Sequence, residues 1–378
     1  MTESPAPLRT DSFLKGRHLL FAVAALLLGA ALVLGAAEGV LRILDYPFRT
    51  SWIPSENAMA QFDPELGWSY IPNRSVTQRF GSDGHPNTMY FNDIGARVGE
   101  PRRHFDSTSP TALFVGDSYT FGHGVTYEES FVGQFERNSG LPFQVVNLGV
   151  QGYGTDQALL ALKRHVEEFN TKVVVYTFLP EHVKRNDNAD RRLIYSDAKF
   201  LGTKPRFALK RDGTLEVVEK PRRYEEMPQL RLWQLVQLAW AKYGPPPSME
   251  LTRALVRDMK DYVEARGATF VLILWTYRHS LPPGQQAGQF FPGIHLNVID
   301  TGAGAPVDWD SWHIPGERHP DARAHARIAR LLMEKFKELG LVPPASATGI
   351  HPPQTHSQIK RSIGGRCGSL RGRRISTA

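Results

Sequence analysis

A serine that could act as a nucleophile stands at the end of an apolar segment. Residues 112–116, ALFVG, have the pattern of a buried strand, and Ser118 follows them after a single aspartate. In open α/β sheets, ligands bind beyond the carboxyl ends of the strands. A serine hydroxyl reacts well only when a base takes its proton, and the charge that develops on the substrate oxygen needs fixed donors. If Ser118 is a nucleophile, we expect a base and at least two hydrogen-bond donors at the ends of other strands.

Three segments resemble blocks of the SGNH/GDSL hydrolase family. FVGDSYTFG (114–122) is similar to the first block, in which Gly-Asp-Ser follows the first strand and the serine is the nucleophile. NLGVQGYGTDQ (147–157) resembles the second block, and HIPGERHPDARAHARIARLL (313–332) resembles the last, where a histidine followed by proline opens the final helix. The resemblance covers residues 111–340 and implies a serine hydrolase that acts on acyl esters.

The resemblance implies a role for one residue of each segment. Ser118 is the nucleophile, His319 is the base, and the backbone N–H groups of Ser118 and Gly152 bind the oxyanion. Pro320 suits the first position of the final helix, whose N-terminus disfavours an imidazolium at His319. Two polar residues are expected to support these groups: Asp117 and Asn147.

The histidine also needs a carboxylate that orients its ring and stabilises the cation formed during the reaction. Family members usually carry aspartate two or three residues before the histidine. These positions hold Glu317 and Gly316 in this chain, so Glu317 is the expected acid, with Asp308 and Asp310 in reserve.

The third block of the family is altered. After the third strand the family presents an asparagine whose amide donates to the oxyanion, whereas this chain has Glu181 there, followed by His182. An ionised carboxylate accepts hydrogen bonds and does not donate them. Three alternatives follow: His182 donates, or Asn186 reaches in from the loop, or the hole has only the two backbone N–H groups. Loss of one oxyanion donor lowers kcat by a factor on the order of 10² to 10³.

No metal or other cofactor is expected. His313, His319 and His325 lack the i, i+4 spacing of a helical zinc motif such as H-E-x-x-H. A separation of six residues does not bring His319 and His325 onto one helical face.

The segment from Leu19 to Ala37 carries no charge and is close to the length of about 20 residues that crosses a bilayer as a helix. We predict a single transmembrane helix at 19–41, with 1–18 in the cytoplasm and the main domain periplasmic or extracellular, from a modest excess of basic residues on the N-terminal side. A cleaved signal peptide is the alternative, but its apolar region usually spans only about 7 to 15 residues.

The remaining pattern predicts a three-layer α/β/α sandwich with a mostly parallel sheet, because near-continuous apolar runs alternate with amphipathic helical segments. The expected strands are 111–116, 143–149, 171–179, 268–277 and 294–300, and the expected helices lie near 159–169, 231–240, 249–266 and 328–339. The predicted organisation is an N-terminal extension (46–110) packed on the main domain, that domain (111–342) with an insertion (187–245), and a disordered basic tail (343–378).

Charge and cysteine content limit the possible partners. The net charge is +7, but residues 345–378 hold six basic residues and no acidic ones, so the first 344 residues carry only +1. Little positive charge remains to follow phosphates, so no nucleic-acid partner is expected. Cys367 is the only cysteine, which excludes an intrachain disulfide.

Two kinds of function are consistent with these features. The first is a membrane-anchored serine esterase acting outside the cytoplasm, with an acylated carbohydrate or lipid as substrate, or an O-acyltransferase of the same chemistry. The second is a non-catalytic envelope scaffold or carbohydrate-binding protein that keeps the fold, which the altered third block would allow.

Overall fold

A computed structural model describes residues 10–48, 59–138, 143–195, 201–227, 229–277 and 290–342. The predicted tail, with Cys367, lies outside these residues.

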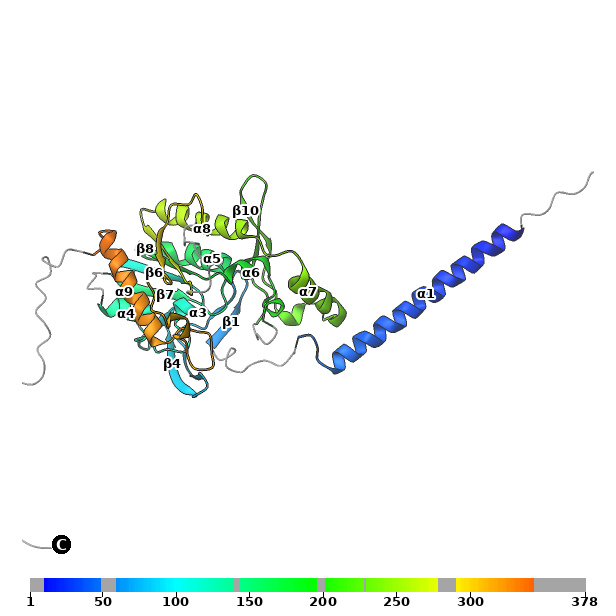
Figure 1. Ribbon diagram of the computed structural model, residues 1–378, viewed down its shortest axis with the longest axis horizontal. Coiled ribbons are helices and arrows are strands. Elements are labelled where there is room, and N and C mark those ends of the chain that lie inside the picture. The colour runs from blue at the N-terminus through cyan, green and yellow to red at the C-terminus, as the bar shows by residue number, and fades with distance from the viewer. Residues whose placement is uncertain are drawn as a thin grey trace, which may run out of the picture.

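An eight-stranded sheet in the order β12-β11-β8-β6-β7-β5-β4-β3 forms the centre of the molecule (Figure 1). The first five strands in this order run parallel, as the apolar runs predict. They are β12 (Asn297–Asp300), β11 (Thr269–Leu274), β8 (Asn170–Phe178), β6 (Pro110–Gly116) and β7 (Gln144–Gly149). The carboxyl end of β6, which leads into Ser118, therefore lies between the ends of two neighbouring strands.

The segment before residue 110 adds three antiparallel strands to the same sheet beyond β7. These are β5 (Arg97–Val98), β4 (His85–Phe91) and β3 (Ser75–Phe80), and a separate hairpin pairs β1 (Ala60–Asp63) with β2 (Gly67–Tyr70). The N-terminal extension is thus continuous with the sheet that carries Ser118.

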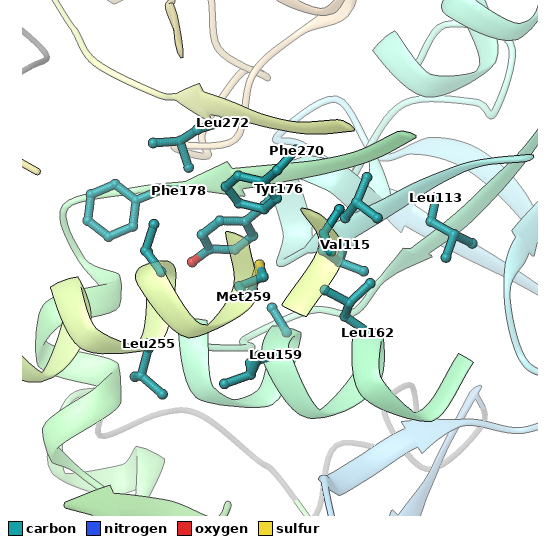
Figure 2. Close-up of a cluster of buried hydrophobic side chains, with 14 of the residues drawn as sticks. Leu113, Val115, Leu159, Leu162, Tyr176, Phe178, Leu255, Met259, Phe270 and Leu272 are labelled. Carbon is teal, nitrogen blue, oxygen red and sulfur yellow. The ribbon is translucent and has the colours of Figure 1, made fainter. Parts of the chain in front are cut away.

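Helices cover both faces of the parallel strands, which confirms the three-layer arrangement. Leu113 and Val115 of β6 contact the layer of α5 (Thr155–His165) and α8 (Met249–Glu264), in the cluster drawn in Figure 2. Ala112 and Phe114, which alternate with them, contact the opposite layer of α4 (Phe131–Asn138) and α9 (Ala322–Glu338). This alternation follows from the two-residue period of a strand, with both faces buried.

Residues after β8 form several short elements at one edge of the α5 and α8 layer. A hairpin pairs β9 (Arg206–Leu209) with β10 (Leu215–Glu219) around Asp212-Gly213, and α7 (Arg231–Tyr243) confirms the helix expected near 231–240. The other short helices are α3 (Ser118–Phe121), α6 (His182–Asp187) and the 3₁₀ turns Val166–Glu168, Arg191–Leu193, Tyr224–Glu226 and Trp309–Ser311.

The N-terminal helix α1 (Thr10–Ile43) projects away from the sheet, with α7 beside its C-terminal end (Figure 1). Its part from Arg17 to Ile43 has a mean hydropathy of up to 2.7 over an 18-residue window, which is apolar enough to cross a membrane. Membrane spans and N-terminal signal sequences share this property.

The start of α9 differs from the prediction. The helix begins at Ala322, and Asp321 is its N-cap, accepting from the backbone N–H groups of Arg323 (2.9 Å) and Ala324 (3.1 Å). Pro320 therefore precedes the cap and is not the first helical residue. An aspartate side chain satisfies the free N–H groups of a first turn, which explains why the helix starts there. His319 therefore lies outside the helix, two residues before its N-cap.

His325 of α9 is buried in the core, where its Nδ1 accepts the backbone N–H of Phe131 at 3.2 Å. Burial lowers the pKa of His325 to about 3. Because this pKa is below the value in the unfolded chain, about 6.5, the unfolded state binds an extra proton between the two values, and stability falls as the pH falls through this window.

We predict that the free energy of unfolding decreases by about 2 kcal/mol more between pH 7 and pH 5 in the wild type than in His325→Gln, since only the wild type carries this titrating group. Urea titration of the full chain in detergent measures the difference. His104→Gln is the control, because the His104 side chain is 72% exposed. The same pH dependence in all three proteins would contradict the prediction.

Candidate active site

The turn after β6 places Ser118 at the edge of the sheet. Gly116 has φ +152°, and a Cβ atom there would lie 2.3 Å from Thr120 Oγ1, so only glycine allows this tight exit from the strand. Asp117 then caps α3 by accepting the backbone N–H of Tyr119 at 3.0 Å. Ser118 is the first residue of this single turn of helix and is only 5% exposed.

His319 and Glu317 complete a chain of polar contacts to Ser118. The Nε2 atom of His319 lies 3.0 Å from the Ser118 hydroxyl, and its Nδ1 lies 3.4 Å from Glu317 Oε2. The other carboxylate oxygen of Glu317 accepts the backbone N–H of Gly81 at 2.8 Å. The structure therefore brings together all three residues of the predicted Ser-His-acid set.

A second histidine, which is not among the predicted site residues, joins this series of polar contacts. His123 Nε2 lies 3.0 Å from Glu317 Oε2, the same oxygen that faces His319. Its ring stacks on the ring of His319, with 3.9 Å between centroids and 30° between planes. His123 stands five residues after Ser118, but no spacing rule distinguishes it from an ordinary loop histidine.

The proton positions of His123 follow from its two partners. A carboxylate only accepts, so Nε2 carries the hydrogen toward Glu317, and Nδ1 accepts from the Gln151 amide 2.5 Å away. Burial lowers the pKa of His123 to about 4, which keeps the ring neutral near pH 7. Hydrogen bonds from His123 and His319 hold the pKa of Glu317 well below its usual range, so the carboxylate is ionised.

His123, Glu317 and His319 also form a group of possible metal ligands, with ligand atoms that all lie within 4.8 Å of one another. The hydrogen-bonded chain from Gln151 to Ser118 uses the same atoms. The ligand atoms of these three residues therefore already have polar partners within the protein.

Two backbone N–H groups are candidates for an oxyanion hole, as the resemblance implies. Within the described residues, the N–H groups of Ser118 and Gly152 donate to no other protein atom. Gly152 has φ +77°, a conformation that favours glycine. The peptide bond between Gln151 and Gly152 carries this N–H. Its carbonyl oxygen, that of Gln151, accepts a hydrogen bond from the indole N–H of Trp68 at 2.9 Å.

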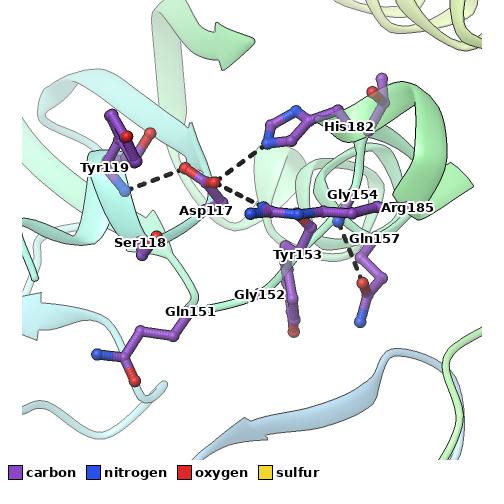
Figure 3. Close-up of polar contacts among 12 residues, drawn as sticks. Asp117, Ser118, Tyr119, Gln151, Gly152, Tyr153, Gly154, Gln157, His182 and Arg185 are labelled. Carbon is purple, nitrogen blue, oxygen red and sulfur yellow. Dashed lines mark hydrogen bonds and ion pairs between the residues drawn. The ribbon is translucent and has the colours of Figure 1, made fainter. Parts of the chain in front are cut away.

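His182 has a different environment from the one expected of an oxyanion donor. It is fully buried, with Nε2 3.2 Å from Asp117 Oδ2 (Figure 3). Its Nδ1 lies 2.9 Å from the Tyr176 hydroxyl. Both ring nitrogens thus face other partners, and the expectation that His182 donates to the oxyanion does not fit this arrangement. Its role is to bind the carboxylate that caps the turn of Ser118.

Asn186 and Glu181 do not supply the missing donor either. The Asn186 side chain accepts the backbone N–H of Thr155 at 2.9 Å and donates to the hydroxyls of Thr155 and Thr252, so it fastens the start of α5. Glu181 is exposed at the start of α6. Of the three alternatives for the altered block, the arrangement favours a hole made of the two backbone N–H groups.

The supporting residues lie beside the turn of Ser118. Asn147 donates to the carbonyl of Thr120 and accepts the N–H of Gly149, both at 3.0 Å, which links the end of β7 to α3. The reserve acid Asp308 accepts the indole N–H of Trp312 at 2.8 Å.

Arg97 of β5 holds the loop that carries His123, and nothing in the sequence pattern indicated this role. Its guanidinium is buried and donates to the carbonyls of Phe121 (2.6 Å), Gly122 (2.5 Å) and Val125 (2.7 Å). Burial lowers its pKa to about 10, which still leaves it charged near pH 7.

Comparison with known proteins finds esterases and lipases among solved structures. No family model and no curated protein matches the chain. The crystal structure of TesA has 16% sequence identity to this chain. The match covers 61% of this chain and 99% of TesA, with a TM-score of 0.35. The acetylxylan esterase Axe2 from Geobacillus stearothermophilus is 15% identical (60% and 94% covered, TM-score 0.32), and the lipase/acylhydrolase from Enterococcus faecalis is 14% identical (61% and 96%, TM-score 0.36). At these values the function has to be argued from the site itself.

A buried ion pair stabilises the turn of Ser118. Arg185 Nη1 lies 2.7 Å from Asp117 Oδ2 and also donates to the carbonyl of Tyr153. Burial by itself would raise the pKa of Asp117, but the hydrogen bond from His182 and the charge of Arg185 bring it well below its usual value. The carboxylate is therefore charged although no part of it is exposed.

We predict that Arg185→Met lowers the free energy of unfolding by about 3 to 5 kcal/mol, because it leaves the Asp117 charge buried beside a neutral histidine. Urea titration of the full chain measures this loss. Arg206→Met is the matched control, since Arg206 pairs with Glu219 near the surface, and it should cost no more than about 1 kcal/mol. Equal losses in the two variants would refute the buried-pair argument.

Proposed function

We propose that this protein is a membrane-anchored serine esterase of the SGNH/GDSL type that acts on an acyl ester outside the cytoplasm. The observation that carries the proposal is the 3.0 Å contact between the hydroxyl of Ser118 and Nε2 of His319, two residues 201 positions apart. A non-catalytic scaffold has no need of a base beside this hydroxyl, or of a carboxylate beside the base.

The contacts give each group one task in the reaction. His319 Nε2 takes the proton of Ser118 Oγ while that oxygen attacks the acyl carbon, and Glu317 stabilises the imidazolium. The N–H groups of Ser118 and Gly152 bind the oxygen that becomes negative. His319 then gives its proton to the departing alkoxide, and a water molecule, activated by the same base, releases the acyl group from Ser118.

His123 acts through Glu317 and His319 as a positioning residue. Its N–H fixes the carboxylate oxygen that receives His319, and its neutral ring supports the catalytic ring by stacking. A protonated His123 would repel the imidazolium, so the low pKa of His123 suits this position.

An acylated carbohydrate or lipid is the proposed substrate class. The proposal rests on α1, which is apolar enough to anchor the domain at a membrane, where such esters occur. Transfer of the acyl group to an acceptor other than water would use the same acyl-serine, so the tests below separate formation of this intermediate from its release.

The first test compares the full chain in detergent with Ser118→Ala and His319→Ala on a short-chain aryl ester. We expect either substitution to reduce kcat/KM by roughly 10⁴- to 10⁶-fold, because the two residues work as one unit. Release of the coloured alcohol is the measurement. A covalent fluorophosphonate probe should label the wild type and not Ser118→Ala.

Equal background rates in all three proteins, together with no labelling of Ser118, would rule out the esterase. Labelling of Ser118 without turnover would instead indicate that the acyl group needs an acceptor other than water.

The second test concerns His123. His123→Leu removes the N–H that donates to Glu317, so we expect kcat to fall by about 10- to 100-fold with KM unchanged, as for a lost hydrogen bond to a charged group. His123→Gln places an amide N–H near the position of Nε2 and should recover part of the loss. A change in KM alone, or no difference between Leu and Gln, would exclude the positioning role.

A further inference from the structure

The helix α7 buries polar side chains and exposes large apolar ones, which is the reverse of a typical surface helix. Its buried residues are polar, Arg231 and Gln234. Its exposed residues include large aromatic side chains: Trp233 is 54% exposed, Trp240 71% and Tyr243 77%. Surface helices normally turn the apolar face to the core, so this arrangement indicates an apolar partner on the outside.

The exposed apolar residues of α7 lie on one face. Trp233, Val236, Trp240 and Tyr243 follow one another at steps of three, four and three residues, which is the spacing of a single helical stripe. By the same geometry residue 242 stands on the opposite side of the helix, and the long Lys242 side chain reaches back over the Tyr243 ring, with Nζ 5.2 Å from the ring centroid. Tryptophan and tyrosine are the residues that gather at membrane–water interfaces.

Polar contacts tie the start of α7 to the end of the apolar part of α1. Glu38 directly follows the uncharged run that ends at Ala37, and its carboxylate accepts the backbone N–H groups of Arg231 (3.0 Å) and Leu232 (2.9 Å). Arg42 donates to the carbonyl of Gln229 at 2.8 Å. The first turn of α7 is thus fixed at the level where the apolar segment of α1 ends.

A further contact, from the Arg231 guanidinium to Asp45 at 2.6 Å, lies just beyond the same end of α1. The side chain of Arg231 therefore serves the junction of the two helices, which explains why a charged residue is buried in α7.

We propose that α7 lies in the interface of the membrane that α1 crosses, with its Trp233–Tyr243 stripe among the lipid headgroups and upper acyl chains. This inference rests on the proposed anchoring by α1. The two helices then hold the domain at two points, and α7, about 20 Å long, limits its tilt relative to the bilayer. The attachment of α7 to the end of α1 through Glu38 and Arg42 selects lipid as the partner over a second copy of the chain.

The experiment uses the full chain with Cys367→Ser and one introduced cysteine that carries a nitroxide label. The protein is reconstituted in phosphatidylcholine–phosphatidylglycerol liposomes, and electron paramagnetic resonance measures how readily oxygen and a water-soluble nickel chelate reach the label. The labelled variants are Trp240→Cys and Val236→Cys on the stripe, Lys242→Cys as the matched control on the same helix, and Leu28→Cys inside α1.

We expect the ratio of oxygen to nickel accessibility to be several-fold higher at positions 240 and 236 than at 242, and high at position 28. Two stripe positions are used so that one poorly folded variant does not decide the result. Equal ratios at 236, 240 and 242 with a high ratio at 28 would overturn the inference and leave the anchor intact. Shielding of the stripe from both reagents would overturn it in favour of a protein partner. A low ratio at 28 would refute the anchoring itself.

Discussion

The site depends on the contacts that the Glu317 carboxylate makes with three N–H groups. These belong to Gly81, His123 and His319, which lie in the β3–β4 turn, the loop after α3 and the segment before α9. A partly buried charge is stable only when donors replace the water it loses. The three segments must therefore assemble before the charge is satisfied, and once they have done so they place His319 against Ser118.

This dependence makes the N-terminal extension a part of the site. Its β3–β4 turn supplies Gly81, its Arg97 fixes the loop of His123, and its Trp68 holds the peptide that presents the N–H of Gly152. Because these donors and acceptors are backbone groups or side chains carried by strands of the main sheet and of the β1–β2 hairpin, they constrain the site to a single geometry. Preorganisation of this kind costs no rearrangement when the reaction occurs.

The sequence predicted those parts of the structure that depend on local patterns. The apolar runs predicted the parallel strands, because residues buried on both faces leave a continuous signal, and the strand end predicted the position of Ser118. The sequence could not reveal His123, whose role depends on a carboxylate 194 positions away. It also misplaced the start of α9, because the cap preference of Asp321 outweighs that of a proline at the first helical position.

The segment after β8 balances the buried charge of Asp117. A buried carboxylate beside Ser118 needs strong partners, and His182 and Arg185 on α6 provide them. The turn of Ser118 thereby gains a rigid support. The N–H of Gly152 stays fixed because the carbonyls on either side of it are held, that of Gln151 by Trp68 and that of Gly152 by Arg191 at 2.7 Å. In the proposed reaction, a donor held in this way binds the oxyanion without rearrangement.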